Sequence, residues 1–307
     1  MKVVVENLTK HIGQQTMLDS LSFEAKRGEV LGFLGPDRAG KTTLLRIIAG
    51  FLRPDGGNVF IGKNSILKNN KNLRKKIGYL PEKNPLYYDM SIIDFLNFIA
   101  KLNDVPKYMI PTRIMDMLRF CGLEHEKHKN IKELSKGYRQ RVGIAQALIH
   151  NPDIILLDEP TTGLDPNQTN EIRQMIRAIG KEKTVILCSH LLSEIESTCD
   201  KVVILNHGVA VASGTTMELK RGSGNNRVLE FMAYGADSSE IKEKLKELNG
   251  VIKIEFIKDY FELTVKRDIS IEKDLFKMCV KEGWYFKQLS EVKTTLEDIF
   301  LQLTQGL

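Results

Sequence analysis

Long apolar segments are missing from this chain of 307 residues. No apolar run approaches the roughly 18 residues that a helix needs to cross a bilayer. The N-terminal stretch MKVVVENLTK is too short and too polar to act as a secretory signal. The sequence therefore predicts a cytosolic protein, in which any role at a membrane comes through a partner.

Cysteine is scarce, and aromatic residues are missing where nucleic-acid binding would need them. The four cysteines form no CxxC pair, which indicates neither a zinc site nor a disulfide framework. The basic stretch KNSILKNNKNLRKK (63–76) has no aromatic residue, whereas nucleic-acid binding favours aromatic side chains between the cations. A solvated surface explains this stretch better. No nucleic-acid partner is therefore expected, despite the net charge of +6.

Short apolar strands alternate with helices over residues 1–220. The run TTLLRIIAG has helical periodicity, and Gly50 is placed to end that helix. A further helical region is expected over 91–123, with a break near Pro106 and Pro111. Such alternation is typical of an α/β fold around a mainly parallel sheet. The predicted buried strands are GEVLGFL (28–34), IGYLPEKNP (77–85, ending at its prolines), DIILLDEP (153–160), KTVILCSH (183–190) and KVVILN (201–206).

The composition changes at KRGSGNNR (220–227), so we expect a linker over 221–227 between a first domain, 1–220, and a second domain, 228–307. The order strand, helix, strand, strand, helix, strand indicates a small ferredoxin-like α+β domain, followed by a last helix. This second domain has no chemical motif, and regulation, dimer support and partner docking are all open for it. The predicted elements are 228–233, 238–248, 251–257, 260–266, 271–282, 284–290 and 294–304.

A phosphate-binding loop is indicated at GPDRAGKTT (35–43), which matches G-x-x-x-x-G-K-[ST] after a strand and before a helix. Successive backbone N–H groups form an anion nest, and the following helix adds positive charge at its N-terminus. Lys41 can reach the outer phosphates, and the Thr42 hydroxyl can hold Mg²⁺. The candidate nucleotide-binding residues are Gly35, Pro36, Asp37, Arg38, Ala39, Gly40, Lys41, Thr42 and Thr43.

Two acids close the apolar strand IILLDE (154–159). Ligands of parallel sheets bind at the carboxyl ends of the strands, so Asp158 emerges beside the phosphate loop. Asp158 is placed to hold Mg²⁺ through water, and Glu159 can orient and deprotonate an attacking water. Ser135 is expected to open a helix as its N-cap, with Gly137 permitting close approach.

The order of these motifs resembles that of the ATP-binding subunits of ABC transporters, over about residues 1 to 220. After the phosphate loop come a Q-loop-like YLPEKNP (79–85), the signature LSKGY (134–138), the Walker B strand, the D-loop GLD (163–165) and a switch histidine, His190. Finer details resemble the ABC-2-type exporter ATPases. PEKNPLYYDM, LSKGYRQRVGIAQALIHNP and TTLEDIFLQLT are especially like the gliding-motility-associated subgroup.

This resemblance implies a P-loop fold with a helical subdomain at about 86–150 and a dimer that closes on two ATP molecules with Mg²⁺. Ser135 and Gly137 of the second copy would complete each site. His190 would touch the γ-phosphate, and Asp165 would shape the dimer contact. A separate membrane permease would hold the protein at the inner face of the cell membrane. The surface facing it would be Glu82 with segment 86–130, although a plain helical core also explains that segment.

Three residues depart from the family pattern. His11 stands where an aromatic residue usually stacks on adenine, and Glu82 replaces the glutamine that reaches the metal. Arg38 replaces a glycine, and a left-handed conformation there would cost roughly 1–2 kcal/mol. We expect a working site, in which Arg38 points away from the nest toward the dimer interface.

Two other classes of function are open. A soluble ATP-driven factor acting on ribosomes or DNA usually has two cassettes or a long coiled coil, and this chain has one cassette and no heptad array. A nucleotide-responsive regulator would bind without hydrolysis. Glu159 and His190 argue against that function, whereas Arg38 and Glu82 leave it open.

Overall fold

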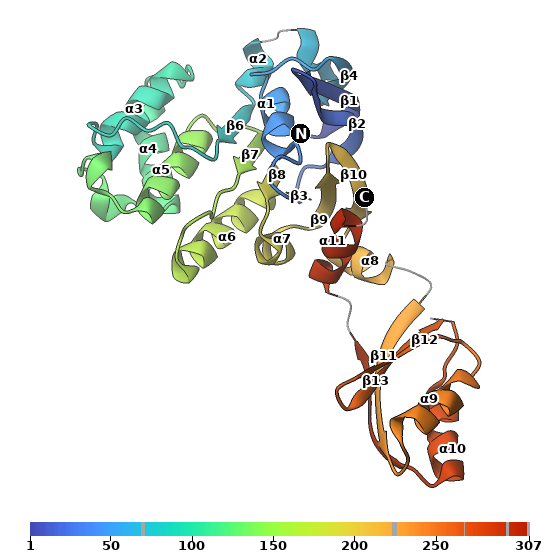
Figure 1. Cartoon of the computed structure of the whole chain (residues 1–307). Coiled ribbons are helices and arrows are strands. Elements are labelled where there is room, and N and C mark those ends of the chain that lie inside the picture. The colour runs from blue at the N-terminus through green and yellow to red at the C-terminus, as the bar shows by residue number, and fades with distance from the viewer. Residues whose placement is uncertain (69–70, 223–225, 267, 293–294, 306–307) are drawn as a thin grey trace. The chain divides into compact units, whose positions relative to one another are not determined.

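The computed structural model of the chain describes residues 1–68, 71–222, 226–266, 268–292 and 295–305 (Figure 1). Internal contacts divide the chain into two units. The first is Met1–Thr216 together with the last residues from Leu303 on, and the second is Met217–Gln302.

A six-stranded sheet forms the centre of the first unit, in the order β10-β9-β3-β8-β7-β6. All neighbours are parallel except β10, which pairs antiparallel with β9. Because both faces of the parallel strands are covered, β3, β7 and β8 are buried along their whole length. The mainly parallel sheet predicted from the apolar runs is confirmed. The strands are β3 (Glu29–Leu34), β6 (Ile77–Leu80), β7 (Ile154–Asp158), β8 (Thr184–Ser189), β9 (Lys201–Asn206) and β10 (Val209–Gly214).

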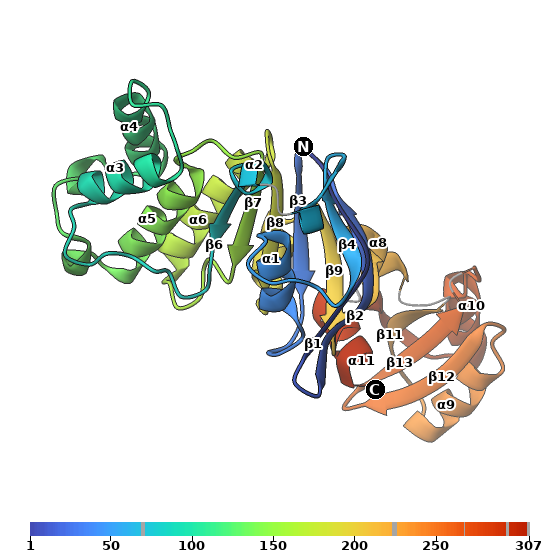
Figure 2. The same cartoon turned by 90° about the horizontal axis from the view of Figure 1, so that it is seen from above.

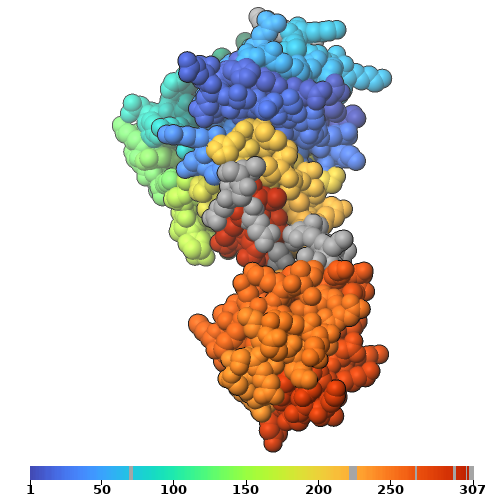
Figure 3. Space-filling model, turned by 45° about the vertical axis from the view of Figure 1, so that its right-hand side comes forward, coloured from blue at the N-terminus to red at the C-terminus, as the bar shows by residue number. Residues whose placement is uncertain are grey.

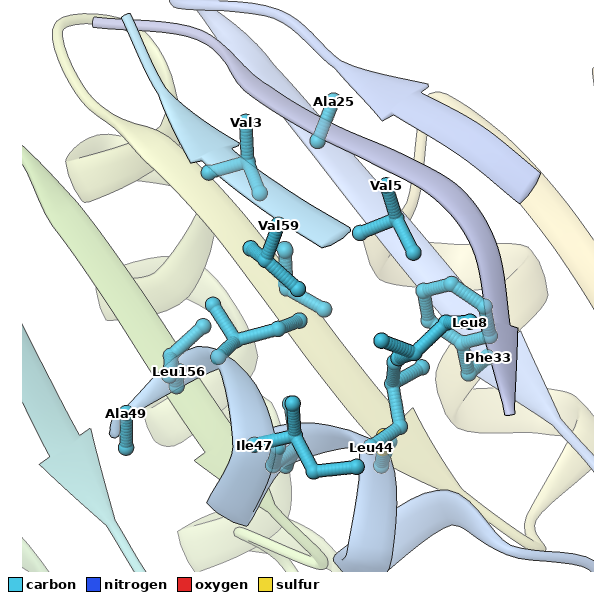
Figure 4. Packing of buried hydrophobic residues seen from close by; sticks show 14 of the residues in the cluster. Val3, Val5, Leu8, Ala25, Phe33, Leu44, Ile47, Ala49, Val59 and Leu156 are labelled. Carbon is cyan, nitrogen blue, oxygen red and sulfur yellow. The ribbon is translucent and has the colours of Figure 1, made fainter. Parts of the chain in front are cut away.

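A second, antiparallel sheet has the order β2-β1-β4-β5. Helix α1 lies between the two sheets, and Figure 4 shows Leu44 and Ile47 of this helix packed against Val5, Val59 and Leu156. Of these four strands, the sequence predicts only β1, because VVVENL (3–8) alternates as a strand does. The elements are β1 (Val3–Ile12), β2 (Gln15–Ala25), α1 (Lys41–Ile48), β4 (Gly56–Ile61) and β5 (Asn64–Ser65).

The opposite face of the central sheet is covered by α6 (Pro166–Gly180) and α7 (Leu192–Thr198). A Cβ atom on Gly32 of β3 would collide with Ile195 and Cys199, so this glycine allows α7 to approach the sheet closely.

Three further helices stand beside β6 and β7, on the left of Figures 1 and 2. They are α3 (Ile92–Leu102), α4 (Ile110–Phe120) and α5 (Lys136–Leu148). The expected break lies at residues 103–109, and Pro111 stands in the first turn of α4, where a missing N–H group is tolerated. The remaining short elements are α2 (Lys71–Arg74) and 3₁₀ turns at Ile66–Lys68, Glu124–Glu126 and Ile131–Glu133.

The second unit, mostly orange in Figure 3, has the predicted order of elements. Its sheet order is β12-β13-β11-β14 with antiparallel neighbours, as two interleaved βαβ units require. Phe231, Phe261 and Leu263 of the sheet pack with Leu245 and Leu275 of the helices. The elements are β11 (Asn226–Tyr234), α9 (Ser238–Lys246), β12 (Val251–Ile257), β13 (Tyr260–Lys266), α10 (Glu272–Glu282) and β14 (Tyr285–Val292). The last helix, α11 (Leu296–Gln305), begins in this unit and ends among the residues from Leu303 on that belong to the first unit.

The expected linker, 221–227, falls partly on regular structure. Residues 221–222 end α8 (Thr216–Gly222), and residues 226–227 begin β11. Residues 223–225 lie outside the described part of the chain.

One ion pair links strand β11 to the start of α10. Arg227 Nη1 lies 2.5 Å from Glu272 Oε1, and Arg227 Nη2 donates to the Ile269 carbonyl oxygen at 3.1 Å. The hydrogen bond from Arg227 lowers the pKa of Glu272 to about 2. The pair therefore stabilises the second unit above the unfolded pKa of about 4.3, and this contribution is lost as the pH falls toward 2.

We expect Arg227→Gln to lower the free energy of unfolding of the second unit by about 1 kcal/mol at pH 7, since Glu272 is partly exposed. The difference should shrink as the pH approaches 2. Trp284, the one tryptophan of the chain, is buried in this unit, so its fluorescence during urea denaturation reports this transition. Lys253→Gln, which removes an exposed pair with Glu255, is the control. Equal effects of the two changes would contradict the prediction.

Candidate functional site

The loop between β3 and α1 is fixed by two close backbone approaches. A Cβ atom on Gly35 would lie 2.5 Å from the Leu205 carbonyl oxygen, and one on Gly40 would collide with that of Met17. Gly40 also has φ +102°, a conformation that favours glycine. Only glycine fits both positions, so the loop is held between β2 and the end of β9.

The N-terminus of α1 faces a cavity of about 300 Å³. Gly40 is the N-cap residue, and no side chain caps the helix there. The first N–H groups of a helix have no partner within it and attract anions. Most of the predicted site residues line this cavity: Asp37, Arg38, Ala39, Gly40, Lys41, Thr42, Thr43, Glu82, Glu159 and His190. Met17 and Thr162 line it too, and the sequence analysis missed both.

Lys41 is buried and held by oxygen atoms of its own loop. Its Nζ donates to the carbonyl oxygens of Gly35 at 2.6 Å and Pro36 at 3.0 Å, and lies 3.7 Å from Glu159 Oε1. These contacts satisfy the ammonium group inside the fold. Gly35 and Pro36 thus join the site through their carbonyl groups.

Glu159 connects the other reactive side chains. Its Oε2 lies 2.8 Å from His190 Nδ1 and accepts a hydrogen bond from Thr162 Oγ1 at 3.2 Å. Its backbone has φ +49°, a conformation that is uncommon for a residue with a side chain. Such strain is stored preferentially at functional sites.

Asp158 lies fully buried next to this group. Within the described residues, neither of its carboxylate oxygens has a hydrogen-bond partner. The pKa of Asp158 is raised to about 6, chiefly by burial; the Thr42 hydroxyl and the charge of Lys41 act to lower it, and the charges of Glu159 and Glu82 act to raise it. A buried carboxylate without a partner, beside a threonine hydroxyl, offers the oxygen donors that Mg²⁺ prefers.

Arg38 has φ +65°, the left-handed conformation considered in the sequence analysis, and its side chain is exposed. It lines the cavity, and the described part of the chain provides it with no ion pair.

His11, Ser135 and Gly137 do not line the cavity. His11 lies exposed on the β1–β2 hairpin, with Nδ1 3.1 Å from Thr16 Oγ1. Ser135 is the N-cap of α5, as predicted, and its hydroxyl accepts a hydrogen bond from the Tyr138 N–H group. A Cβ atom on Gly137 would collide with Gln168. Met17, from β2, is a large apolar residue that the structure places at the cavity.

Family models and known proteins agree on what this chain is similar to. The ABC transporter model matches residues 18–162, and the model of the C-terminal domain of DrrA1-3-like ATP-binding proteins matches residues 214–304. An uncharacterized ABC transporter ATP-binding protein of Methanocaldococcus jannaschii is 37% identical, over 90% of this chain and 98% of that protein. The bacitracin transport ATP-binding protein BcrA of Bacillus licheniformis is 32% identical, over 98% of this chain and 96% of that protein.

Among solved structures, an ATP-binding subunit of an ABC transporter has a TM-score of 0.67 and 27% identity, over 80% of this chain and all of that one. A dimeric ATP-binding cassette in a post-hydrolysis state, bound to ADP and phosphate, has a TM-score of 0.63 and 25% identity. The match covers 69% of this chain and 98% of that one.

These matches confirm the predicted fold, ATP hydrolysis and the ABC-2 exporter type. In the described part of the chain, no helix has the length and apolarity to cross a membrane. The chain belongs to the family of ATP-binding, ATP-hydrolysing subunits of ABC transporters, of the DrrA-like type.

Proposed function

We propose that this chain powers export through a separate membrane permease, with two copies closing on two ATP molecules. The observation that supports this most is the contact of Glu159 with both Lys41 and His190 at one cavity. Relatives named for bacitracin transport, Nod factor export and linearmycin resistance favour export. The sequence motifs also favour the gliding-motility-associated subgroup within the exporters.

The roles of the site residues follow from their placement. Backbone N–H groups of the loop and of α1 bind the phosphates, and Lys41 exchanges its loop carbonyls for phosphate oxygens. Thr42, Asp158 and Glu82 hold Mg²⁺, which supplies neutralising charge. Glu159 orients and deprotonates the water, and His190, at hydrogen-bond distance from Glu159, contacts the γ-phosphate.

The second copy completes each site. Ser135 is exposed and lies outside the cavity of its own chain, so its hydroxyl is free to meet the nucleotide of another copy. Gly137 lets that helix start approach closely. His11 contacts the adenine. The dimeric post-hydrolysis relative supports this arrangement.

The permease contacts a second cavity, of about 500 Å³, next to Glu82. Its lining is largely apolar and comes from segments on both sides of Glu82: Phe51, Tyr79, Pro81, Pro85, Ile99 and Leu102. An apolar cavity between α3 and β6 suits an inserted apolar segment of a partner. This contact places the protein at the cytoplasmic face of the membrane and assigns segment 86–130 to partner binding.

Arg38 faces the dimer interface in this proposal, because it is exposed and has no ion pair among the described residues. Arg38→Gly removes the left-handed strain of roughly 1–2 kcal/mol and the charge together. We expect the variant to bind ATP but to lose dimer closure, measured by light scattering with ATP. Unchanged closure and unchanged ATPase rate would contradict this role.

Glu159→Gln tests the hydrolytic role. The amide keeps the shape but cannot take a proton, so turnover should fall by at least about 100-fold while ATP-bound dimers accumulate. Phosphate release and size-exclusion chromatography with ATP measure the two effects. Glu182→Gln, an exposed acid outside the cavity lining, should leave both unchanged. A Glu159→Gln variant with normal turnover would show that hydrolysis uses another base.

Gly40→Ala tests the loop geometry. The positive φ alone costs roughly 1–2 kcal/mol and the collision with Met17 adds to it, so ATP affinity should fall by more than about tenfold. Titration calorimetry with Mg²⁺ and ATP measures this. Gly283→Ala has a similar positive φ but open space around it, so only the second unit should lose stability. Unchanged ATP affinity in Gly40→Ala would refute the assignment of this loop.

A further inference from the structure

A fully buried acid lies behind the candidate site, on the first turn of α7. Glu194 has no exposed surface, and within the described residues neither of its carboxyl oxygens has a hydrogen-bond partner. Leaving a carboxylate in this condition costs several kcal/mol. The proposed roles of the cavity residues make no use of it.

Two buried hydroxyl groups surround this carboxyl, and each lies close in the chain to a residue of the cavity. Ser189 is the last residue of β8 and directly precedes His190. Its Oγ accepts a hydrogen bond from the Leu191 N–H group at 3.0 Å, so its own proton is free to be donated. Thr161 lies two residues after Glu159, is almost fully buried, and its hydroxyl also lacks a partner among the described residues.

Burial raises the pKa of Glu194, and the hydroxyls of Ser189 and Thr161 lower it by stabilising the charged form. Arg173 also lowers it; this side chain is anchored on α7 by a 3.2 Å hydrogen bond from its Nη2 to Ser193 Oγ. Neither hydroxyl forms a bond of normal length and direction with Glu194 in this structure.

The two turns that carry Thr161 and Ser189 are those that present Glu159 and His190. Glu159 N donates to the Cys188 carbonyl oxygen at 2.9 Å, so the two strand ends already share one backbone bond. The side-chain contact between Glu159 and His190 at 2.8 Å depends on how both turns are held beyond that bond.

We propose that Glu194 is a positioning residue for ATP hydrolysis, an inference that rests on the proposed function. In the state competent for hydrolysis, its carboxylate accepts hydrogen bonds from the hydroxyls of Ser189 and Thr161. Through these hydroxyls it fixes the turn after β7 relative to the turn after β8. This keeps His190 at hydrogen-bond distance from Glu159. Misplacing a catalytic group by about 1 Å costs about 100-fold in rate.

The decisive variant is Glu194→Met, which fills the space but accepts no hydrogen bond. Replacing a buried charge by an apolar residue is often neutral or stabilising, so the protein should fold at least as well as the wild type. We expect kcat to fall about 10- to 100-fold while KM for ATP stays within about twofold. Glu194→Gln, which retains one accepting oxygen, should recover most of kcat. Glu196→Met, on the exposed side of the same helix, is the matched control and should keep the wild-type rate.

A double-mutant cycle identifies the partners. Thr161→Val and Ser189→Ala should each lower kcat, and adding either to Glu194→Met should lower it little further, because each pair acts as one unit. Additive losses, or a wild-type kcat in Glu194→Met, would overturn the inference. A fall in thermal stability that fully accounts for the lost rate would overturn it too. If the wild-type protein itself did not hydrolyse ATP, the proposed function would fail instead.

Discussion

The geometry of the site depends on a close backbone contact between the loop after β3 and its two neighbours. Gly40 lies against the Met17 carbonyl of β2, and Gly35 lies against that of Leu205 at the end of β9. Because neither position has room for a Cβ atom, the loop cannot shift without moving strands in both sheets. Helix α1, packed between those sheets, therefore points its free N–H groups at a fixed place. The contacts of Lys41 and Glu159 follow from this placement.

Charge is balanced inside the site before any nucleotide is considered. The ammonium group of Lys41 faces the loop carbonyls and Glu159, while Asp158 is kept partly protonated near neutral pH because burial raises its pKa to about 6. Phosphate oxygens would take the place of the loop carbonyls and Glu159 beside the Lys41 ammonium group. A divalent cation would neutralise the carboxylate of Asp158. The protein can stay folded with these groups buried because Lys41 has partners within the chain and Asp158 is partly neutral.

Local patterns in the sequence predicted much of this molecule. The strands of the parallel sheet are apolar runs, the loop has fixed glycine spacing, and the elements of the second unit alternate with clear turns. The antiparallel sheet was largely missed, since residues 15–25 and 56–61 have little regular alternation. The side-chain partners could not be predicted either. Met17 and Thr162 enter the cavity, and His11 stays outside it, because of contacts between segments distant in the chain.

Two residues with side chains, Arg38 and Glu159, have positive φ and line the same cavity. Glycine at these positions would remove the strain but also the functional group, so the strain is the cost of presenting a charged side chain at that point. For Glu159 the gain is evident, because the bent backbone directs the carboxylate to His190 and Lys41. The same reasoning applies to Arg38, whose side chain has no such partner within the described chain. We propose that its partner comes from outside the chain: either bound phosphate or the second copy would give the guanidinium a counter-charge that the described residues do not provide.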